Sequence, residues 1–497
     1  MSTTYSFIER HGLWSAAQQD AATAALARAE ERGITSIRLS WPDQHGLLRG
    51  KSLSRPAFAA ALRSGVEITM APFFFDTANA IVFNPFSVGG GFDMPELSGS
   101  PNVVMVPDPG TFRVLPWAPD TGWVLCDLYF RDGSPFPFAP RSILRRTLED
   151  LAGTGYDLTA GLEIEWYLTR VVDNNLTGSL GGPGSPGDPP TVTPVARGYN
   201  YLLEAHLDEV DDALAPIRSA IEALGLPLRS FDDEWAPSQI ETTFDVLEGM
   251  AAADAAVLFR SAVKQVARRH GYAATFMCTP AVPGFYCSGW HLHTSVTERA
   301  TGANAMVPGA GEALSEVGRH WVGGTLAHGV AASVFTTPTV NGYRRRRPYS
   351  LAPDRLAWGM DNRAAMMRVI SSPGDPSSHV ENRVGEPAAN PYLYLAAQAA
   401  SGLDGIRHKI DPGPISDNPY AEETAAQLPQ TLGAALEALA GDDFFRAAFG
   451  SRFIDYLVTM KGSEWARYSA WLEANPDDST YVNGVTDWEH REYFELF

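Results

Sequence analysis

Cysteine, long apolar runs and positive charge are all scarce in this sequence of 497 residues. The three cysteines, Cys126, Cys278 and Cys287, are odd in number and show no C-x-x-C spacing, which favours the reducing cytoplasm over a disulfide-bonded secreted scaffold. No apolar stretch is long enough to cross a membrane, and the N-terminus lacks the basic and apolar segments of a signal peptide. We therefore expect a cytoplasmic protein without a membrane partner.

The charge balance is acidic. Lys and Arg number 38 against 58 Asp and Glu, which gives a net charge of -20. Such a chain is a poor partner for nucleic acid, because phosphate backbones bind basic surfaces. It can still bind ATP through a local cluster of arginines and metal. Apart from the negative net charge, the composition is ordinary for a globular protein. The length allows two or three domains and a large core.

Local patterns divide the chain into three parts. Ser15 with Gln18 forms a capping-box pattern that starts an alanine-rich helix, and Gly33 ends it. Ile34 to Trp41 alternates like a strand and is followed by a turn signal. The run Gly181 to Gly187 is expected to be an exposed loop without regular structure. We predict a helical extension over 1–33, a small β-rich domain over 34–133 and a larger α+β domain over 134–497.

Paired carboxylates mark the first candidate site. In Gly161 to Leu168 the alternation places Glu163 and Glu165 on one strand face and apolar side chains on the other. Neighbouring carboxylates repel each other unless a cation lies between them, so the pair is a candidate site for a hard metal. Two ordinary surface glutamates are the alternative. The segment from Asp233 to Glu241 adds two more carboxylates, those of Glu234 and Glu241.

Two histidines extend this set. His291 and His293 share one face of a predicted strand. An H-x-H pair is a weak signal alone, and a structural pair is at least as common. Together with four glutamates it indicates a two-metal cluster. Carboxylate-rich ligation suits Mg²⁺ or Mn²⁺ better than Zn²⁺.

Spaced arginines follow, with one more carboxylate, Glu381. Guanidinium groups bind phosphates and carboxylates well. Carboxylates for metals together with arginines for anions are typical of phosphoryl transfer from a metal nucleotide, although the sequence shows neither a Walker A motif nor a G-x-G-x-x-G turn between a strand and a helix. For Arg344, Arg346 and Arg347 we favour surface salt bridges. The arginines assigned to anions are Arg345, Arg363, Arg368 and Arg383.

These segments occur in the same order as in type I glutamine synthetases, which the chain resembles from roughly Ile34 onward. The most specific matches are Glu381-Asn382-Arg383, Asn390-Pro391-Tyr392-Leu393 and Gly402-Leu403-Asp404-Gly405. The resemblance implies an N-terminal β-grasp domain and a C-terminal catalytic domain of antiparallel strands backed by helices. It also implies a homo-oligomer, usually two stacked hexameric rings, whose active sites are shared between neighbouring subunits.

The resemblance also assigns roles to residues. The implied reaction has two steps, in which ATP phosphorylates the γ-carboxylate of glutamate and an amine attacks the acyl phosphate. By resemblance, Arg345 holds the amino-acid carboxylate, Arg363 and Arg368 bind phosphate, and Arg383 lies near the reacting carboxylate. The remaining assignments are the first metal, at Glu165, Glu234 and Glu241; the second metal, at Glu163, His291 and Glu381; and nucleotide contacts, at His293 and Ser295.

The sequence departs from the family where ammonia would bind. Leu351 stands at the position of a catalytic glutamate, and Asn102 replaces an acidic residue near the ammonium pocket. Asp76 still matches the aspartate that a neighbouring subunit contributes to bind and deprotonate ammonium. An ammonium ion needs negative charge, which Leu351 does not supply, whereas an apolar wall suits an organic amine.

These departures favour a hydrophobic acceptor over a polyamine. Aniline is mainly neutral at neutral pH and needs little help to lose a proton, so the γ-glutamylanilide synthetases are the subfamily we favour. The alternatives are an ordinary glutamine synthetase with a rearranged lid, a polyamine γ-glutamyl ligase and a catalytically silent member. Retention of all six metal ligands argues against silence.

Two further positions leave questions open. Tyr286-Cys287 replaces the Asn-Gly that normally contacts glutamate, although Arg345 and Arg383 still favour glutamate as the donor. Tyr420 lies near a tyrosine that some bacterial members adenylylate, and here we favour an unmodified loop residue.

Overall fold

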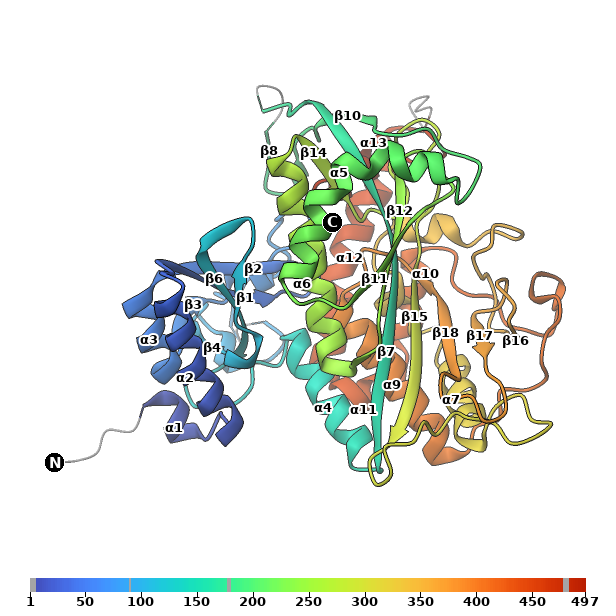
Figure 1. Cartoon of the computed structure of the whole chain (residues 1–497), viewed down its shortest axis with the longest axis horizontal. Helices are drawn as coiled ribbons and strands as arrows, with labels where there is room; N and C mark the ends of the chain where they lie inside the picture. Colours follow the sequence, from blue (N-terminus) through green and yellow to red (C-terminus); the bar gives the residue numbers. More distant parts are fainter. Residues whose placement is uncertain (1–5, 89–90, 177–179, 477–481) are drawn as a thin grey trace.

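The N-terminal sheet carries its helices on one side (Figure 1). The computed structural model describes residues 6–88, 91–176, 180–476 and 482–497. The strand order is β2-β1-β6-β4-β3, with β5 paired to β6. The predicted capping box is present, since the Ser15 side chain accepts from the N–H of Gln18 at the start of α2. The elements are α1 (Phe7–His11), α2 (Ala16–Glu31), β1 (Ser36–Pro42), β2 (Leu48–Ser54), α3 (Arg55–Ser64), β3 (Val66–Thr69), β4 (Asn102–Pro107), β5 (Arg113–Leu115) and β6 (Ala118–Tyr129).

The second sheet has ten strands and is built around one of them, β7 (Tyr156–Asp173). Its order is β11-β12-β7-β15-β18-β17-β16, and β10, β13 and β14 also pair with β7. Pairing is antiparallel except between β16 and β17. The strands are β10 (Thr191–Pro194), β11 (Leu228–Asp233), β12 (Gln239–Phe244), β13 (Leu247–Glu248), β14 (Tyr272–Thr275), β15 (Trp290–Glu298), β16 (Trp358–Met360), β17 (Met367–Ile370) and β18 (His379–Gly385).

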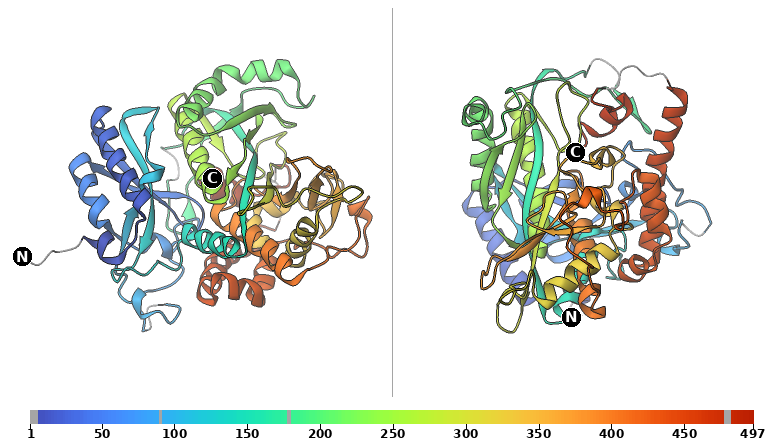
Figure 2. Two further views of the ribbon diagram at one scale, coloured as in Figure 1. Left: turned by 60° about the horizontal axis from the view of Figure 1, so that its bottom comes forward. Right: turned by 90° about the vertical axis from the view of Figure 1, so that its right-hand side faces the viewer.

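Helices back this second sheet. On β7, Leu162, Ile164 and Trp166 are buried, so one strand face lies in the core while the glutamates face the other way. The views in Figure 2 show the long helix α12 and helix α5 on opposite sides of the molecule. The helices are α4 (Pro140–Ala152), α5 (Glu204–Ala223), α6 (Gly249–Arg269), α7 (Glu316–Ala327), α8 (Ser333–Thr336), α9 (Pro391–His408), α10 (Leu432–Ala440), α11 (Asp443–Phe449), α12 (Ser451–Ala474) and α13 (Asp487–Tyr493).

The α+β class is confirmed, and two local expectations need correction. Part of the glycine-rich run is regular: β8 (Gly181–Gly182) and β9 (Ser185–Pro186) form a small hairpin, because Gly181 and Gly184 adopt the positive φ that its turns require. Arg346 is buried and not a surface residue; it donates to the Pro429 carbonyl at 2.6 Å. Among the described helices, none is long and apolar enough to span a bilayer.

Candidate active site

Strand pairing brings the carboxylates together on the face of the second sheet opposite the apolar side chains of β7. Glu165 on β7 lies opposite Glu241 on β12, and Glu163 lies opposite His291 on β15. Glu234 follows the end of β11, and the chain returns to Gln239 at the start of β12. Ligand atoms of Glu165, Glu234 and Glu241 lie within 4.8 Å of one another. The structure therefore groups the three residues expected at one metal.

A second group adjoins the first. Nδ1 of His291 lies 2.5 Å from Glu163 and 3.5 Å from Glu381, which is fully buried. His293 also contacts Glu163, with Nε2 and Oε2 separated by 3.0 Å. His291 thus contacts both expected carboxylates. The ligand atoms that lie within 4.8 Å of one another, however, are those of Glu163, His293 and Glu381, and His291 forms such a group with Glu163 and Glu241. Ser295 is two residues further along β15, opposite Thr159 of β7.

The electrostatics of this cluster show an excess of negative charge. Burial raises the pKa of Glu165 to about 8, with Glu234 next in effect, and raises that of Glu241 to about 10 with help from Glu163 and Glu165. Burial raises the pKa of Glu234 to about 7. Against its own burial, His291 and His293 hold the pKa of Glu163 well below its usual range. The carboxylates of this donor set repel one another, and divalent cations, which suit carboxylate and histidine ligands, would remove the repulsion.

The arginines lie beside the cluster in two settings. Arg345 is buried and donates to the carbonyl of Gly385 at 2.7 Å. Arg368 and Arg383 both donate to the carboxylate of Glu381, Arg368 at 2.9 Å. Arg363 is exposed, and its side chain forms no hydrogen bond or ion pair with any residue that the structure describes. Its guanidinium is available to an incoming anion.

Three residues were expected around the acceptor pocket, namely Leu351, Asn102 and Asp76. Within one chain no hydrogen bond or ion pair between described residues connects them. Leu351 is 66% exposed. The amide of Asn102 donates to Glu67 at 3.0 Å. Asp76 is buried and accepts from the N–H groups of Ala78 and Ala80 and from the guanidinium of Arg467 at 2.9 Å. Among the described residues of one chain, Asp76 forms no hydrogen bond or ion pair with the carboxylate cluster.

Several supporting residues were missed by the sequence analysis. The amide of Gln239 donates to Glu165 at 3.2 Å and to the Ser288 hydroxyl at 2.9 Å, and the N–H of Gly289 donates to Glu165 at 2.8 Å. His379 lies 3.0 Å from His293. Gln239 could have been found from its spacing of two from Glu241 on a strand.

The two positions left open by the sequence make ordinary contacts. The N–H of Tyr286 donates to the Tyr167 hydroxyl at 2.9 Å, and Cys287 accepts from the Thr279 hydroxyl at 3.0 Å. The Tyr420 hydroxyl donates to the carbonyl of Ala352 at 3.0 Å, so Tyr420 packs beside the segment that contains Leu351.

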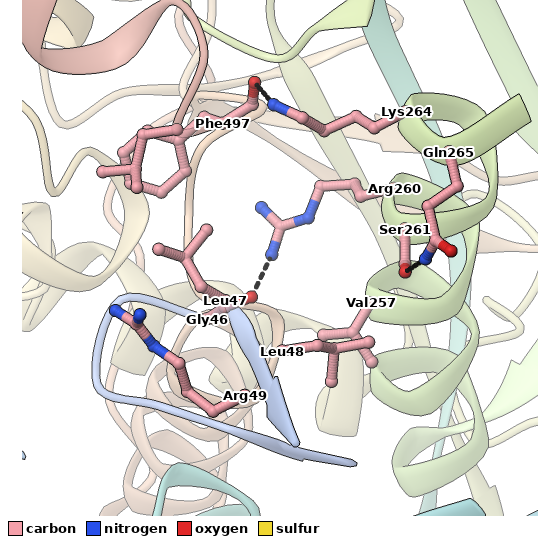
Figure 3. A pocket seen from close by; sticks show the side chains of 11 residues that line it. Gly46, Leu47, Leu48, Arg49, Val257, Arg260, Ser261, Lys264, Gln265 and Phe497 are labelled. Atoms are coloured by element: carbon pink, nitrogen blue, oxygen red, sulfur yellow. Dashed lines mark hydrogen bonds between the residues drawn. The ribbon is translucent and has the colours of Figure 1, made fainter. Parts of the chain in front are cut away.

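A separate pocket of about 290 Å³ lies between the β1–β2 turn, α6 and the last residues of the chain (Figure 3). None of its lining residues belongs to the carboxylate cluster. Arg260 donates to the Gly46 carbonyl at 3.0 Å, and Lys264 donates to the backbone oxygen of Phe497. The first bond connects the β1–β2 turn to α6 and the second connects α6 to the C-terminal residue, so we assign the pocket a packing role.

Comparisons with known proteins agree with this geometry. Residues 137–478 match the family model described as glutamine synthetase, catalytic domain. The chain is 54% identical to a γ-glutamylanilide synthase of Acinetobacter sp, covering 100% of both chains, and 31% identical to a glutamate–isopropylamine ligase of Pseudomonas sp, covering 94% of this chain and 96% of that one. A solved GmaS/ADP complex superposes with a TM-score of 0.74 at 29% identity, over 94% of this chain and 98% of that one. The chain belongs to the glutamine synthetase family.

Proposed function

We propose that this protein is an ATP-dependent ligase that joins the γ-carboxylate of glutamate to an organic amine, with an aromatic amine such as aniline as its preferred acceptor. The observation that carries the proposal is the place of Leu351. Its apolar side chain is exposed, and its backbone carbonyl accepts a hydrogen bond from Arg383. An ammonium ion gains nothing from such a wall, whereas the ring of aniline loses contact with water there. The 54% identity to a γ-glutamylanilide synthase supports the same acceptor.

The cofactors in this proposal are ATP and two Mg²⁺ or Mn²⁺ ions. Glu165, Glu234 and Glu241 would hold one ion, and Glu163, His291 and Glu381 the other. When bound, such ions supply positive charge that binds the phosphates of ATP and favours phosphoryl transfer. His293 and Ser295 would contact the nucleotide.

The arginines would position the reacting groups. Arg345 is buried beside the cluster and would orient the amino-acid end of glutamate, while Arg363 is free to bind the transferring phosphate. Arg368 and Arg383 would reach the phosphate and the reacting carboxylate while both remain bound to Glu381. Asp76, supplied by a neighbouring subunit, would accept a proton from the amine.

This role for Asp76 implies an oligomer, and we propose two stacked hexameric rings with shared sites. Three free cysteines suit a reducing compartment, so we place the enzyme in the cytoplasm. The pathway would be the breakdown of an aromatic or alkyl amine. An ordinary glutamine synthetase with a rearranged lid is the second candidate, in which another carboxylate would offset the missing glutamate at position 351. A polyamine ligase or a silent family member is less consistent with an apolar Leu351 beside six grouped ligands.

Phosphate release tests these alternatives. The protein is incubated with ATP, Mg²⁺ and glutamate, and ammonium, ethylamine, isopropylamine, aniline and putrescine are compared as acceptors. Selective turnover with aniline supports the proposal, and selective turnover with an alkyl amine retains the ligase but changes its substrate. Turnover with ammonium alone identifies a glutamine synthetase, and the absence of turnover with every acceptor identifies a silent member.

A further inference from the structure

Three aromatic side chains form an exposed row beside the carboxylate cluster. Trp235, Tyr199 and Tyr286 are 46%, 41% and 52% exposed. The ring centroids of Tyr199 and Trp235 are 5.8 Å apart, and those of Tyr199 and Tyr286 are 6.3 Å apart, both edge to face. Large aromatic rings usually gain stability by burial, so a row of them in solvent indicates a surface that contacts something else.

Both ends of this row are attached to the cluster. Trp235 follows Glu234 directly, and its N–H donates to the Glu234 carboxylate at 2.9 Å. Tyr286 precedes Cys287, whose carbonyl accepts from the amide of Gln239 at 3.5 Å. The same amide donates to Glu165. The rings therefore have a fixed position relative to two carboxylates of the cluster.

The middle of the row is held by an unusual backbone. The backbone φ is positive at three residues of this loop, a conformation that residues other than glycine rarely adopt. Its values are 68° at Tyr199, 60° at Asn200 and 60° at Leu202. The N–H of Tyr199 donates to the Trp235 carbonyl at 2.8 Å, and its hydroxyl donates to the Gly284 carbonyl at 3.3 Å. These bonds stabilise a conformation that presents Tyr199 between the other two rings.

The next tyrosine shows which way this loop faces. Burial raises the pKa of the Tyr201 hydroxyl to about 12, and the charges of Glu234 and Glu241 act in the same direction while Arg363 opposes them. Tyr201 therefore lies within electrostatic reach of the carboxylates and of the unpaired Arg363. Because the N–H of Tyr199 binds the carbonyl of Trp235, which follows Glu234, the loop that carries Tyr199 lies beside the cluster.

We propose that Trp235, together with Tyr199 and Tyr286, forms the wall that holds the ring of the aromatic amine. This inference rests on the proposed function and adds the residues that determine acceptor selectivity. A neutral aromatic amine offers a π face and little charge, so stacking and edge contacts are the interactions that can select it. Its amino group would then point toward the carboxylates behind Trp235, where the acyl phosphate forms.

Steady-state kinetics of Trp235→Leu and Trp235→Phe test the proposal in the full-length protein. We expect Trp235→Leu to raise the KM for aniline roughly tenfold, and Trp235→Phe to restore most of it, because a ring remains available for stacking. The KM values for ATP and glutamate and the affinity for Mn²⁺ should stay within about twofold, since the N–H that binds Glu234 belongs to the backbone. Tyr286→Leu is a second variant at the other end of the row.

A matched control is Tyr272→Leu. Tyr272 is a half-buried tyrosine on β14, and the guanidinium of Arg170 stacks over its ring. This variant should leave the KM for aniline unchanged. An unchanged KM for aniline in both Trp235→Leu and Tyr286→Leu overturns the proposal, and so does a parallel rise in all three KM values. If the unmodified enzyme does not use aniline at all, the proposed function fails first, and that result is visible before any variant is made.

Discussion

The guanidinium of Arg383 donates a hydrogen bond to the backbone carbonyl of Leu351, with 3.4 Å between Nη2 and the oxygen. Leu351 has a φ of 60°, and its side chain is 66% exposed. Because the contact uses a main-chain atom, it does not depend on the nature of the side chain. Position 351 can therefore be changed without loss of this link to Arg383.

Leu351→Glu should shift acceptor preference toward ammonium. A carboxylate at this position would stabilise a small cation, and we expect the ratio of kcat/KM for ammonium to that for aniline to rise about tenfold or more. Leu351→Gln has a similar size without the charge and should leave this ratio near its original value. Phosphate release measures both. An identical ratio in all three proteins would show that position 351 does not determine selectivity.

Glu165→Gln should weaken metal binding and reduce phosphate release by at least about a hundredfold, because an amide cannot replace a carboxylate ligand of Mg²⁺ or Mn²⁺. Titration with Mn²⁺ followed by electron paramagnetic resonance measures the loss directly. Glu248→Gln on β13 is the control, since Glu248 is an exposed glutamate of the same sheet. Full Mn²⁺ stoichiometry in Glu165→Gln would contradict the metal assignment.

Asp76 provides a test of shared active sites. Asp76→Asn keeps an oxygen for the N–H groups of Ala78 and Ala80, and Arg467 retains its ion pair with Glu492 at 2.6 Å, so the fold should survive. We expect this variant and Glu165→Gln each to be inactive with aniline. If sites lie between subunits, random mixing of the two should restore up to about a quarter of the activity, because some sites then combine two unmodified halves.

The mixing experiment uses dissociation and reassembly of the two purified variants, with each variant reassembled alone as the control. Native mass spectrometry confirms that mixed oligomers form. Mixed oligomers without recovered activity would mean that Asp76 and Glu165 serve the same subunit.

Stability should depend on pH through Glu386, which lies outside the cluster. Burial raises the pKa of its carboxyl from 4.5 to about 7. The folded protein therefore keeps a proton that the unfolded chain releases, so this contribution to stability is complete below pH 4.5 and is lost as the pH rises through about 7. Glu386→Gln cannot titrate, yet its amide can replace both contacts with Thr339, each 2.7 Å long.

The free energy of unfolding of Glu386→Gln, relative to the unmodified protein, should increase by roughly 2 to 3 kcal/mol between about pH 5 and pH 8. Urea denaturation followed by circular dichroism at both pH values measures this difference, and taking the difference removes groups that titrate in both proteins. A constant difference between the two proteins would show that Glu386 is ionised in the folded state throughout.

Local patterns in the sequence predicted most of the carboxylate and histidine cluster. Alternation on one strand fixed the direction of Glu163 and Glu165, and it did the same for His291 and His293, because a period of two follows from strand geometry alone. Alternation also located β1, and the capping box of Ser15 and Gln18 located α2. Which strands pair in the second sheet is a long-range property that no local pattern in the sequence predicted.

The remaining contacts lie beyond local patterns. Arg467 pairs with Asp76 although it lies 391 residues away in the sequence, and no local pattern near either residue predicts this ion pair. Arg346 stands in a run of four arginines that looks like a surface segment, yet it is buried with the oxygens of Ser333, Thr337 and Pro429 as acceptors. The row of Trp235, Tyr199 and Tyr286 depends on three loops that meet only in the folded chain.

Strand β7, which pairs with five other strands, has a consequence for how this enzyme folds and takes up metal. The cluster needs Glu163 from β7, Glu241 from β12, His291 from β15 and Glu381 from β18, so its two ends are more than two hundred residues apart in the chain. Strand pairing over such separations is slow, and no partly folded species can present a full ligand set. Uptake of metal during refolding would therefore report the stage at which β18, which lies between β15 and β17, has joined the sheet.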